Sequence, residues 1–194
     1  MVTFTHIEIA ATVLKTVERE LSVRLDRAGF IYGSIKPDIS PALVKILHFK
    51  EFSYEFVKQE IKELMEYRFD ESTKCTRKFS ERLGVVIHYL ADYFCYAHST
   101  HFKGNMFSHL TYEMMLSAYW RLDPKKTKAG MIPDQVYLFT DYPALCSHIE
   151  KLHNGYMARK PSYDLDLAYT LRICTTLCLS VIASCTKKQL GLAA

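Results

Sequence analysis

The feature of this sequence that most constrains its fold is a run of histidines and carboxylates within residues 83–114, LGVVIHYLADYFCYAHSTHFKGNMFSHLTYEM. His88 and Asp92 lie four residues apart, and so do His109 and Glu113. Residues four apart in an α-helix project from successive turns of one face, so each pair can present a nitrogen and an oxygen to one point. The spacing therefore predicts two helices that each carry a potential metal-ligating pair.

A break separates the two pairs. Segment 101–105, HFKGN, contains a Gly-Asn step, which favours the end of a helix. We expect the first helix to begin within residues 73–77 and to carry His98 as well, and the second to begin near Met106. A second helix returning antiparallel to the first would bring the two pairs face to face across a helical hairpin.

Imidazole nitrogen and carboxylate oxygen are both ligands that zinc accepts. A single HxxxD pair is more often a solvated helix face or a plain hydrogen bond, because both residue types are common. Here the pair of His88 and Asp92 lies among apolar residues, and buried polar groups need partners. Two interpretations stay open: a metal site, or His-carboxylate hydrogen bonds that tie the helices together.

Length and composition favour one domain spanning residues 1–194, since 49% of the residues are hydrophobic and supply a full core. Almost no segment alternates with period two, so the expected fold class is all-α, a multi-helix bundle. A formal net charge of +4 is too small to argue by itself for nucleic acid, although it is compatible with an anionic substrate.

Outside the central run, apolar periodicity and turn residues predict the remaining elements. A helix is expected from His6 to about residues 28–29, followed by an ordered loop over 30–41 that contains Asp38. Further helices are expected over 41–47, before His48, and over 53–68 from a serine cap; later ones are expected from Pro143 and over 162–190. A polar break is expected at 69–74, and a basic loop at 123–130 is expected to be a solvated connection or a rim that attracts phosphate.

The six cysteines form no CxxC motif and lie mostly in apolar stretches, so they are expected to be reduced core residues. The N-terminus lacks the charged, apolar and small-residue pattern of a secretory signal. The longest apolar run, 173–185, is shorter than the roughly 20 residues needed to cross a bilayer, which predicts a core helix and no transmembrane segment. The expected location is cytoplasmic.

The order of these residues resembles the ligand series of the zinc-dependent phospholipase C family, whose all-α fold is shared with single-strand-specific zinc nucleases. That series is an N-terminal histidine, an aspartate and a histidine in the next loops, HxxxD, a histidine six residues beyond, and HxxxE. The matching residues are His6, Asp38, His48, His88, Asp92, His98, His109 and Glu113. The residues that match this ligand series lie within about residues 1–122.

The resemblance implies a zinc cluster. One ion would be surrounded by Asp38, His48, His88 and Asp92, and a second by His98, His109 and Glu113. Asp92 would bridge toward a third ion held partly by His6. Secreted family members complete that third site with the amino group and carbonyl of an N-terminal tryptophan, whereas the only tryptophan here is Trp120. Two zinc ions are therefore expected, and a third only with other donors.

The resemblance also implies an activity, which is hydrolysis of a phosphodiester by a zinc-dependent phosphodiesterase of phospholipase C type (EC 3.1.4-like). Zinc would neutralise charge on the phosphate and activate water for attack on phosphorus, with Asp38 as the candidate general base. The expected substrate is a phospholipid or a smaller phosphodiester. Well-known members recognise choline with an aromatic residue directly after the loop aspartate; Ile39 stands there, so phosphatidylcholine is not predicted.

Two alternatives remain open from the sequence. The same zinc cluster would serve a nuclease that stacks single-stranded bases on exposed aromatic side chains beside a basic rim. Alternatively, the chain is a non-catalytic helical protein stabilised by metal or by hydrogen-bonded His-carboxylate pairs, because a fold does not fix a function.

Overall fold

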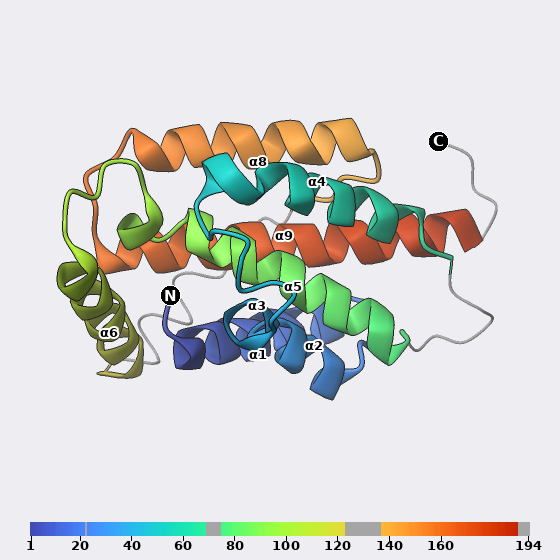
Figure 1. Cartoon of the computed structure of the whole chain (residues 1–194). Helices are drawn as coiled ribbons and strands as arrows, with labels where there is room; N and C mark the ends of the chain where they lie inside the picture. Colours follow the sequence, from blue (N-terminus) through green and yellow to red (C-terminus); the bar gives the residue numbers. More distant parts are fainter. Residues whose placement is uncertain (22, 69–74, 123–136, 190–194) are drawn as a thin grey trace.

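The structure is a computed structural model that describes residues 1–21, 23–68, 75–122 and 137–189, with the backbone alone for 186–189. The described residues form eight α-helices and one 3-10 helix and contain no β-strand, which confirms the expected all-α class (Figure 1). In chain order the helices are α1 (Thr3–Glu20), α2 (Arg27–Gly33), α3 (Lys36–Ile39), α4 (Lys50–Glu66), α5 (Arg77–Tyr93), η1 (Tyr96–His98), α6 (Met106–Leu122), α8 (Tyr142–Met157) and α9 (Tyr163–Gln189).

Helix α5 runs through the core of the molecule. Every residue of segment 83–95 is buried, because α2, α4 and α9 pack against α5 on different sides (Figure 1). A helix enclosed in this way is expected to be apolar all round. Within segment 83–95 the two exceptions are His88 and Asp92, both fully buried. The core of the fold therefore places an imidazole and a carboxylate where water does not reach them.

Glycines allow α2 to approach α5 closely. A Cβ atom added at Gly33 would lie 2.0 Å from the carbonyl oxygen of Glu81, and one added at Gly84 would lie 2.3 Å from the carbonyl oxygen of Phe30. Both distances are far inside van der Waals contact with backbone atoms. The glycines are therefore required by the close approach of the two helices.

The N-terminal part differs from the sequence expectation. The first helix ends at Glu20 instead of near residues 28–29, and the expected loop over 30–41 contains most of α2 and all of α3. The reason for the early restart is a cap: the side chain of Asp26 accepts a hydrogen bond of 2.7 Å from the backbone N–H of Gly29. Residues 41–47 form turns and not the expected helix.

The expected serine cap at Ser53 is also wrong. Helix α4 begins at Lys50, and Ser53 lies inside it, where its hydroxyl donates to the Phe49 carbonyl oxygen at 3.0 Å and lies 2.8 Å from the hydroxyl of Tyr93. A serine inside a helix commonly bonds to the carbonyl four residues before it, which explains this outcome.

The helical hairpin expected around residues 101–105 is not formed. Helix α5 ends at Tyr93, so His98 lies in the separate 3-10 helix η1. Helix α6 begins at Met106 as expected, but it lies across one end of the molecule, where it contacts η1 and α1 and does not run back along α5 (Figure 1). The chain therefore changes direction at η1, between α5 and α6.

The C-terminal expectations are confirmed within the described residues. Asp141 caps α8, with Pro143 in its first turn, and α9 begins at Tyr163. All six cysteines are free thiols. By length and composition, one helix segment, Tyr163–Cys185, could cross a membrane, and 78% of its most apolar window is buried inside the structure, as in a core helix. The polar break at 69–74 and the basic loop at 123–130 lie outside the described residues, and one domain over 1–194 stays a prediction.

We expect Gly33→Ala to lower the free energy of unfolding by about 1–3 kcal/mol, or more, because the added methyl group meets backbone that cannot move aside cheaply. For a chain of this length this corresponds to a fall in Tm of roughly 2–4 °C per kcal/mol. The matched control is Gly155→Ala in α8, where the nearest atom to the new Cβ is 3.8 Å away. Thermal unfolding should show the control unchanged or slightly more stable; equal Tm values for both variants would contradict the close approach.

Candidate metal centre

The eight side chains singled out in the sequence converge on one region, although they come from separate parts of the chain. They are His6 on α1, Asp38 on α3, His48 just before α4, His88 and Asp92 on α5, His98 on η1, and His109 and Glu113 on α6. They form three groups of possible ligand atoms, each within 4.8 Å of one another, among the described residues. The groups are His6, His88 and Asp92; Asp38, His48 and His88; and His98, His109 and Glu113.

Asp92 joins the groups because its two carboxylate oxygens face different histidines. Its Oδ2 atom lies 3.0 Å from His48 Nδ1 and 3.3 Å from His88 Nε2. Its Oδ1 atom lies 3.3 Å from His6 Nε2 and 3.6 Å from His98 Nε2. One buried carboxylate thus reaches toward two sides of the cluster, which is the arrangement that a bridging ligand requires.

The atoms around Asp92 Oδ2 have the spacing of a zinc site. His88 Nε2 lies 3.3 Å from His48 Nδ1 and 3.5 Å from Asp38 Oδ1, and His48 Nδ1 lies 3.8 Å from Asp38 Oδ1. Four ligand atoms at about 2.0–2.1 Å from a tetrahedral zinc ion are roughly 3.3 Å from one another. The side chains of Asp38, His48, His88 and Asp92 therefore need little movement to hold one ion.

The second group is centred on Glu113, which projects inward from α6. Its Oε1 atom lies 2.8 Å from His98 Nε2 and 2.9 Å from His109 Nε2. The pair of His109 and Glu113 keeps the four-residue helical spacing, while η1 supplies His98 in place of the expected long helix. This group shares no residue with the set of Asp38, His48 and His88.

The ring orientation of His88 determines which of its nitrogen atoms can bind a metal ion. His88 Nδ1 lies 2.8 Å from the backbone carbonyl oxygen of Ser34, which can only accept a hydrogen bond, so Nδ1 carries the proton. Only Nε2 then has a lone pair for a metal, and one lone pair serves one ion. If His88 ligates with Asp38 and His48, the third group retains His6 and Asp92 and needs another donor.

The amino group of Met1 lies next to that third group. It donates to Asp92 Oδ1 and lies 3.1 Å from both His98 Nε2 and Glu113 Oε1. Burial lowers the pKa of this amine, but the charges of Asp92 and Glu113 outweigh burial and raise its pKa to about 11. The ammonium group therefore balances part of the negative charge of the two buried carboxylates.

The protonation states of His88, His98 and Asp92 are those that metal ligation requires, whereas, against the effect of burial, Asp92 raises the pKa of His48, and burial raises the pKa of Asp38. Burial and the neighbouring His6 hold the pKa of His88 well below its usual range, and burial also lowers the pKa of His98, so both imidazoles keep a free nitrogen lone pair. Burial opposes ionisation of Asp92, but the surrounding imidazoles and the Met1 amino group hold its pKa well below the ordinary value. Neutral histidine and ionised carboxylate are the ligand forms that bind a metal.

Two atoms of the cluster have close neighbours of opposite charge but no hydrogen bond, as expected where a metal ion would be the partner. Asp92 Oδ2 and His6 Nε2 are buried and make no hydrogen bond of acceptable geometry with any described residue. Buried polar atoms are rarely left without a partner. The donor set of imidazoles and carboxylates, their spacing and these two atoms fit zinc.

Sequence reasoning missed Asp166, a fully buried residue of α9 that holds the corner of the chain in place. Its carboxylate accepts hydrogen bonds from the backbone N–H of Tyr96 in η1 at 3.0 Å, the hydroxyl of Tyr112 in α6 at 3.0 Å and the hydroxyl of Tyr156 in α8 at 2.8 Å. Burial raises its pKa to about 6, against the effect of these three bonds. A charged residue between Leu165 and Leu167 was the available signal.

The described residues define an all-helical protein with three groups of histidine and carboxylate side chains that could hold metal ions. The family model for zinc-dependent phospholipase C matches residues 5–163, so the chain belongs to the zinc-dependent phospholipase C family. Searches of curated proteins and of solved structures give no significant match. Family membership confirms the resemblance seen in the ordered histidines and carboxylates. The ligand role of each residue stays a prediction.

We expect Asp166→Ala to lower the free energy of unfolding by about 3 kcal/mol, because one backbone N–H and two tyrosine hydroxyls lose their acceptor in a buried place. It should also weaken zinc binding, since η1 carries His98. The matched control is Asp164→Ala, which removes an exposed carboxylate bonded to the hydroxyl of Tyr119 and should cost less than about 1 kcal/mol. Thermal unfolding with and without zinc measures both effects; an Asp166→Ala protein as stable as the control would refute this role.

Proposed function

We propose that this protein is a zinc-dependent phosphodiesterase of phospholipase C type that acts on a phospholipid or a smaller phosphodiester. The observation that carries the proposal is the shared carboxylate of Asp92, which lies between ligand groups whose spacing suits zinc. Family membership supports the reaction class. Clustered ions around a bridging carboxylate are typical of enzymes that hydrolyse phosphate esters.

Two zinc ions are the minimum that the geometry supports. Asp38, His48, His88 and Asp92 would hold one, and His98, His109 and Glu113 would hold the other, because these two sets share no residue. His6 and Asp92 offer a third position next to the Met1 amino group. That amine must lose its proton to ligate, so a third ion would bind more weakly than the other two.

When bound, zinc supplies positive charge to the nonbridging phosphate oxygens and lowers the pKa of coordinated water toward about 7. The remaining tasks fall to the protein. Asp92 is fully buried and Glu113 nearly so, and each faces at least two histidines, so their oxygens are already engaged. Asp38 is the carboxylate of the cluster that solvent reaches most, with 24% of its side chain exposed. Asp38 is therefore placed to receive a proton from an attacking water.

The alternatives from the sequence can be weighed against the structure. The nuclease hypothesis drew on a basic rim at residues 123–130, which lies outside the described residues and so adds nothing in its favour. The hypothesis of a purely hydrogen-bonded cluster does not account for Asp92 Oδ2 and His6 Nε2, which are buried and make no hydrogen bond. A cytoplasmic location remains part of the proposal and calls for its own measurement.

We expect the purified protein with a native N-terminus to bind at least two zinc ions per chain. His88→Ala should remove one and His109→Ala the other, because each deletes a ligand of a separate set, and both should abolish phosphodiester hydrolysis. His101→Ala is the matched control, since His101 is exposed and belongs to none of the three groups. Metal analysis by mass spectrometry and a hydrolysis assay measure the two properties. Zinc-free protein after reconstitution, or full activity in His88→Ala, would rule out the proposed centre.

We expect Asp38→Asn to lower kcat by about 10²–10⁴-fold, the usual loss when a general base is removed. Zinc content should fall less than in His88→Ala, because the amide retains a carbonyl oxygen at the same position. Asp164→Asn, an exposed aspartate outside the cluster, serves as the control. If kcat falls only in proportion to zinc content, Asp38 is a ligand and nothing more; an unchanged kcat would exclude both roles.

A further inference from the structure

Helix α6 has two faces with different properties. Its inner face carries His109, Glu113, Leu116 and Trp120, which recur at helical spacing and point into the protein. Its outer face is apolar yet exposed. The apolar face of α6 consists of Met106 (74% exposed), Phe107 (79%), Leu110 (47%), Met114 (63%), Met115 (52%) and Leu122 (83%).

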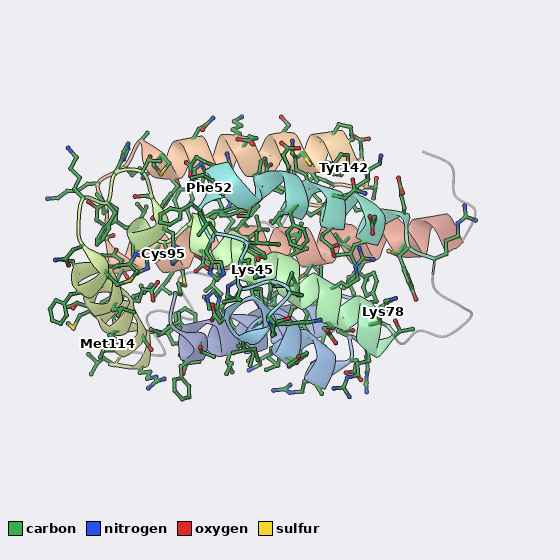
Figure 2. The ribbon with its side chains drawn as sticks, in the orientation of Figure 1. Lys45, Phe52, Lys78, Cys95, Met114 and Tyr142 are labelled. Carbon is green, nitrogen blue, oxygen red and sulfur yellow. The ribbon has the colours of Figure 1, made fainter. Side chains whose placement is uncertain are left out.

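This concentration of large apolar side chains on one helix is unusual for a surface. Single exposed apolar residues are normal, but contiguous apolar patches mark interaction sites. Phe4 of α1 extends the patch, because it is 65% exposed and its ring lies 5.1 Å from the guanidinium carbon of Arg121. Helix α6 lies at one end of the molecule, where Figure 2 labels Met114 (Figures 1 and 2).

The charges around the face suit a lipid surface. Within segment 99–122 the only acidic residue is Glu113, which is buried on the inner side, so the exposed side presents no carboxylate of its own. Lys103 precedes the helix and is exposed, and Arg121 in the last turn pairs with Glu8 of α1 at 3.6 Å. Long basic side chains at the ends of an apolar helix face can reach lipid headgroups while the face enters the acyl region.

A cavity connects this face to the metal centre. Its volume is about 220 Å³, and its lining includes Phe49, Phe102, Met106 and His109. Met106 belongs to the apolar face of α6, and His109 belongs to the ligand group centred on Glu113. A molecule at the apolar face is therefore separated from the candidate metal site only by the width of one partly aromatic cavity.

We propose that the apolar face of α6 docks the protein onto a lipid bilayer with anionic headgroups, with the 220 Å³ cavity opening toward that bilayer. The choice of a bilayer rests on the proposed function, because a phospholipid substrate resides there. The exposed basic residues Lys103 and Arg121, one before the helix and one in its last turn, support it as well, because anionic headgroups attract positive charge beside an apolar helix face. Docking would place His109 and Glu113, on the same helix, next to the lipid surface.

The test is co-sedimentation of the zinc-loaded full chain with vesicles of phosphatidylcholine and phosphatidylglycerol. The double variant Phe107→Gln with Met114→Gln should lower vesicle affinity at least tenfold and leave hydrolysis of a soluble phosphodiester unchanged, because neither residue lies among the ligand groups or lines the cavity. The matched control is Leu138→Gln. Leu138 is 55% exposed, and its neighbours Tyr137 and Phe139 contact His148 of α8 and Ser180 of α9, so this segment packs on helices other than α6.

A second measurement avoids loss-of-function variants. A tryptophan placed by Phe107→Trp should be quenched by brominated lipids, whereas one placed by Leu138→Trp should not; the buried Trp120 gives the same background in both. Absence of vesicle binding by the unmodified protein, equal binding by the double variant, or equal quenching at both positions would overturn the docking surface. The docking surface would also be overturned if the face instead joins two copies of the chain. In that case light scattering would show a dimer that the double variant converts to a monomer, and vesicle binding would not change.

The outcomes separate this inference from the proposed function. Vesicle binding through α6 without hydrolysis of any phosphodiester would leave the docking surface in place and remove the enzyme. Hydrolysis of a soluble phosphodiester without vesicle binding would support the enzyme and exclude the docking surface.

Discussion

The buried charge of Asp92 is the constraint on which the rest of this structure depends. An ionised carboxylate in the middle of a helical core is costly unless opposite charges or strong donors surround it. Here four imidazoles and the Met1 amino group converge on its two oxygens. These groups come from α1, α5, η1 and the segment before α4, so satisfying this one carboxylate fixes how distant parts of the chain meet. A zinc cluster would satisfy it more completely, because it would also engage the unpaired Oδ2 atom.

The packing of α2 on α5 bears directly on that cluster. Gly33 and Gly84 let the two backbones approach closely, and the next residue along the chain, Ser34, then offers its carbonyl oxygen to His88. That hydrogen bond selects the proton position on His88 and so decides which nitrogen remains for a metal. The close helix contact at the glycines thus positions the Ser34 carbonyl group, and this carbonyl group fixes the tautomer of His88.

The sequence predicted which histidines and carboxylates come together better than it predicted the path of the chain between them. The pairs of His88 with Asp92 and His109 with Glu113 followed from helical spacing, which is a local property. The break after Glu20, the turns at 41–47 and the position of His98 in η1 depend on caps and tertiary contacts that periodicity does not report. Asp166 was missed for the same reason: its three partners come from three other elements, and none is near it in the sequence.

Helix α6 shows why the expected hairpin was wrong and what replaced it. The hairpin was expected because the break at 101–105 and an antiparallel return would bring the two His-carboxylate pairs face to face. Instead η1, held by Asp166, turns the chain so that only the side with His109, Glu113 and Trp120 packs inward. The opposite side is left exposed, and no described residue covers it. An exposed apolar face costs solubility, and here it lies on the helix that also carries the candidate ligands His109 and Glu113, so the proposed lipid surface would give both sides of α6 a role at one site.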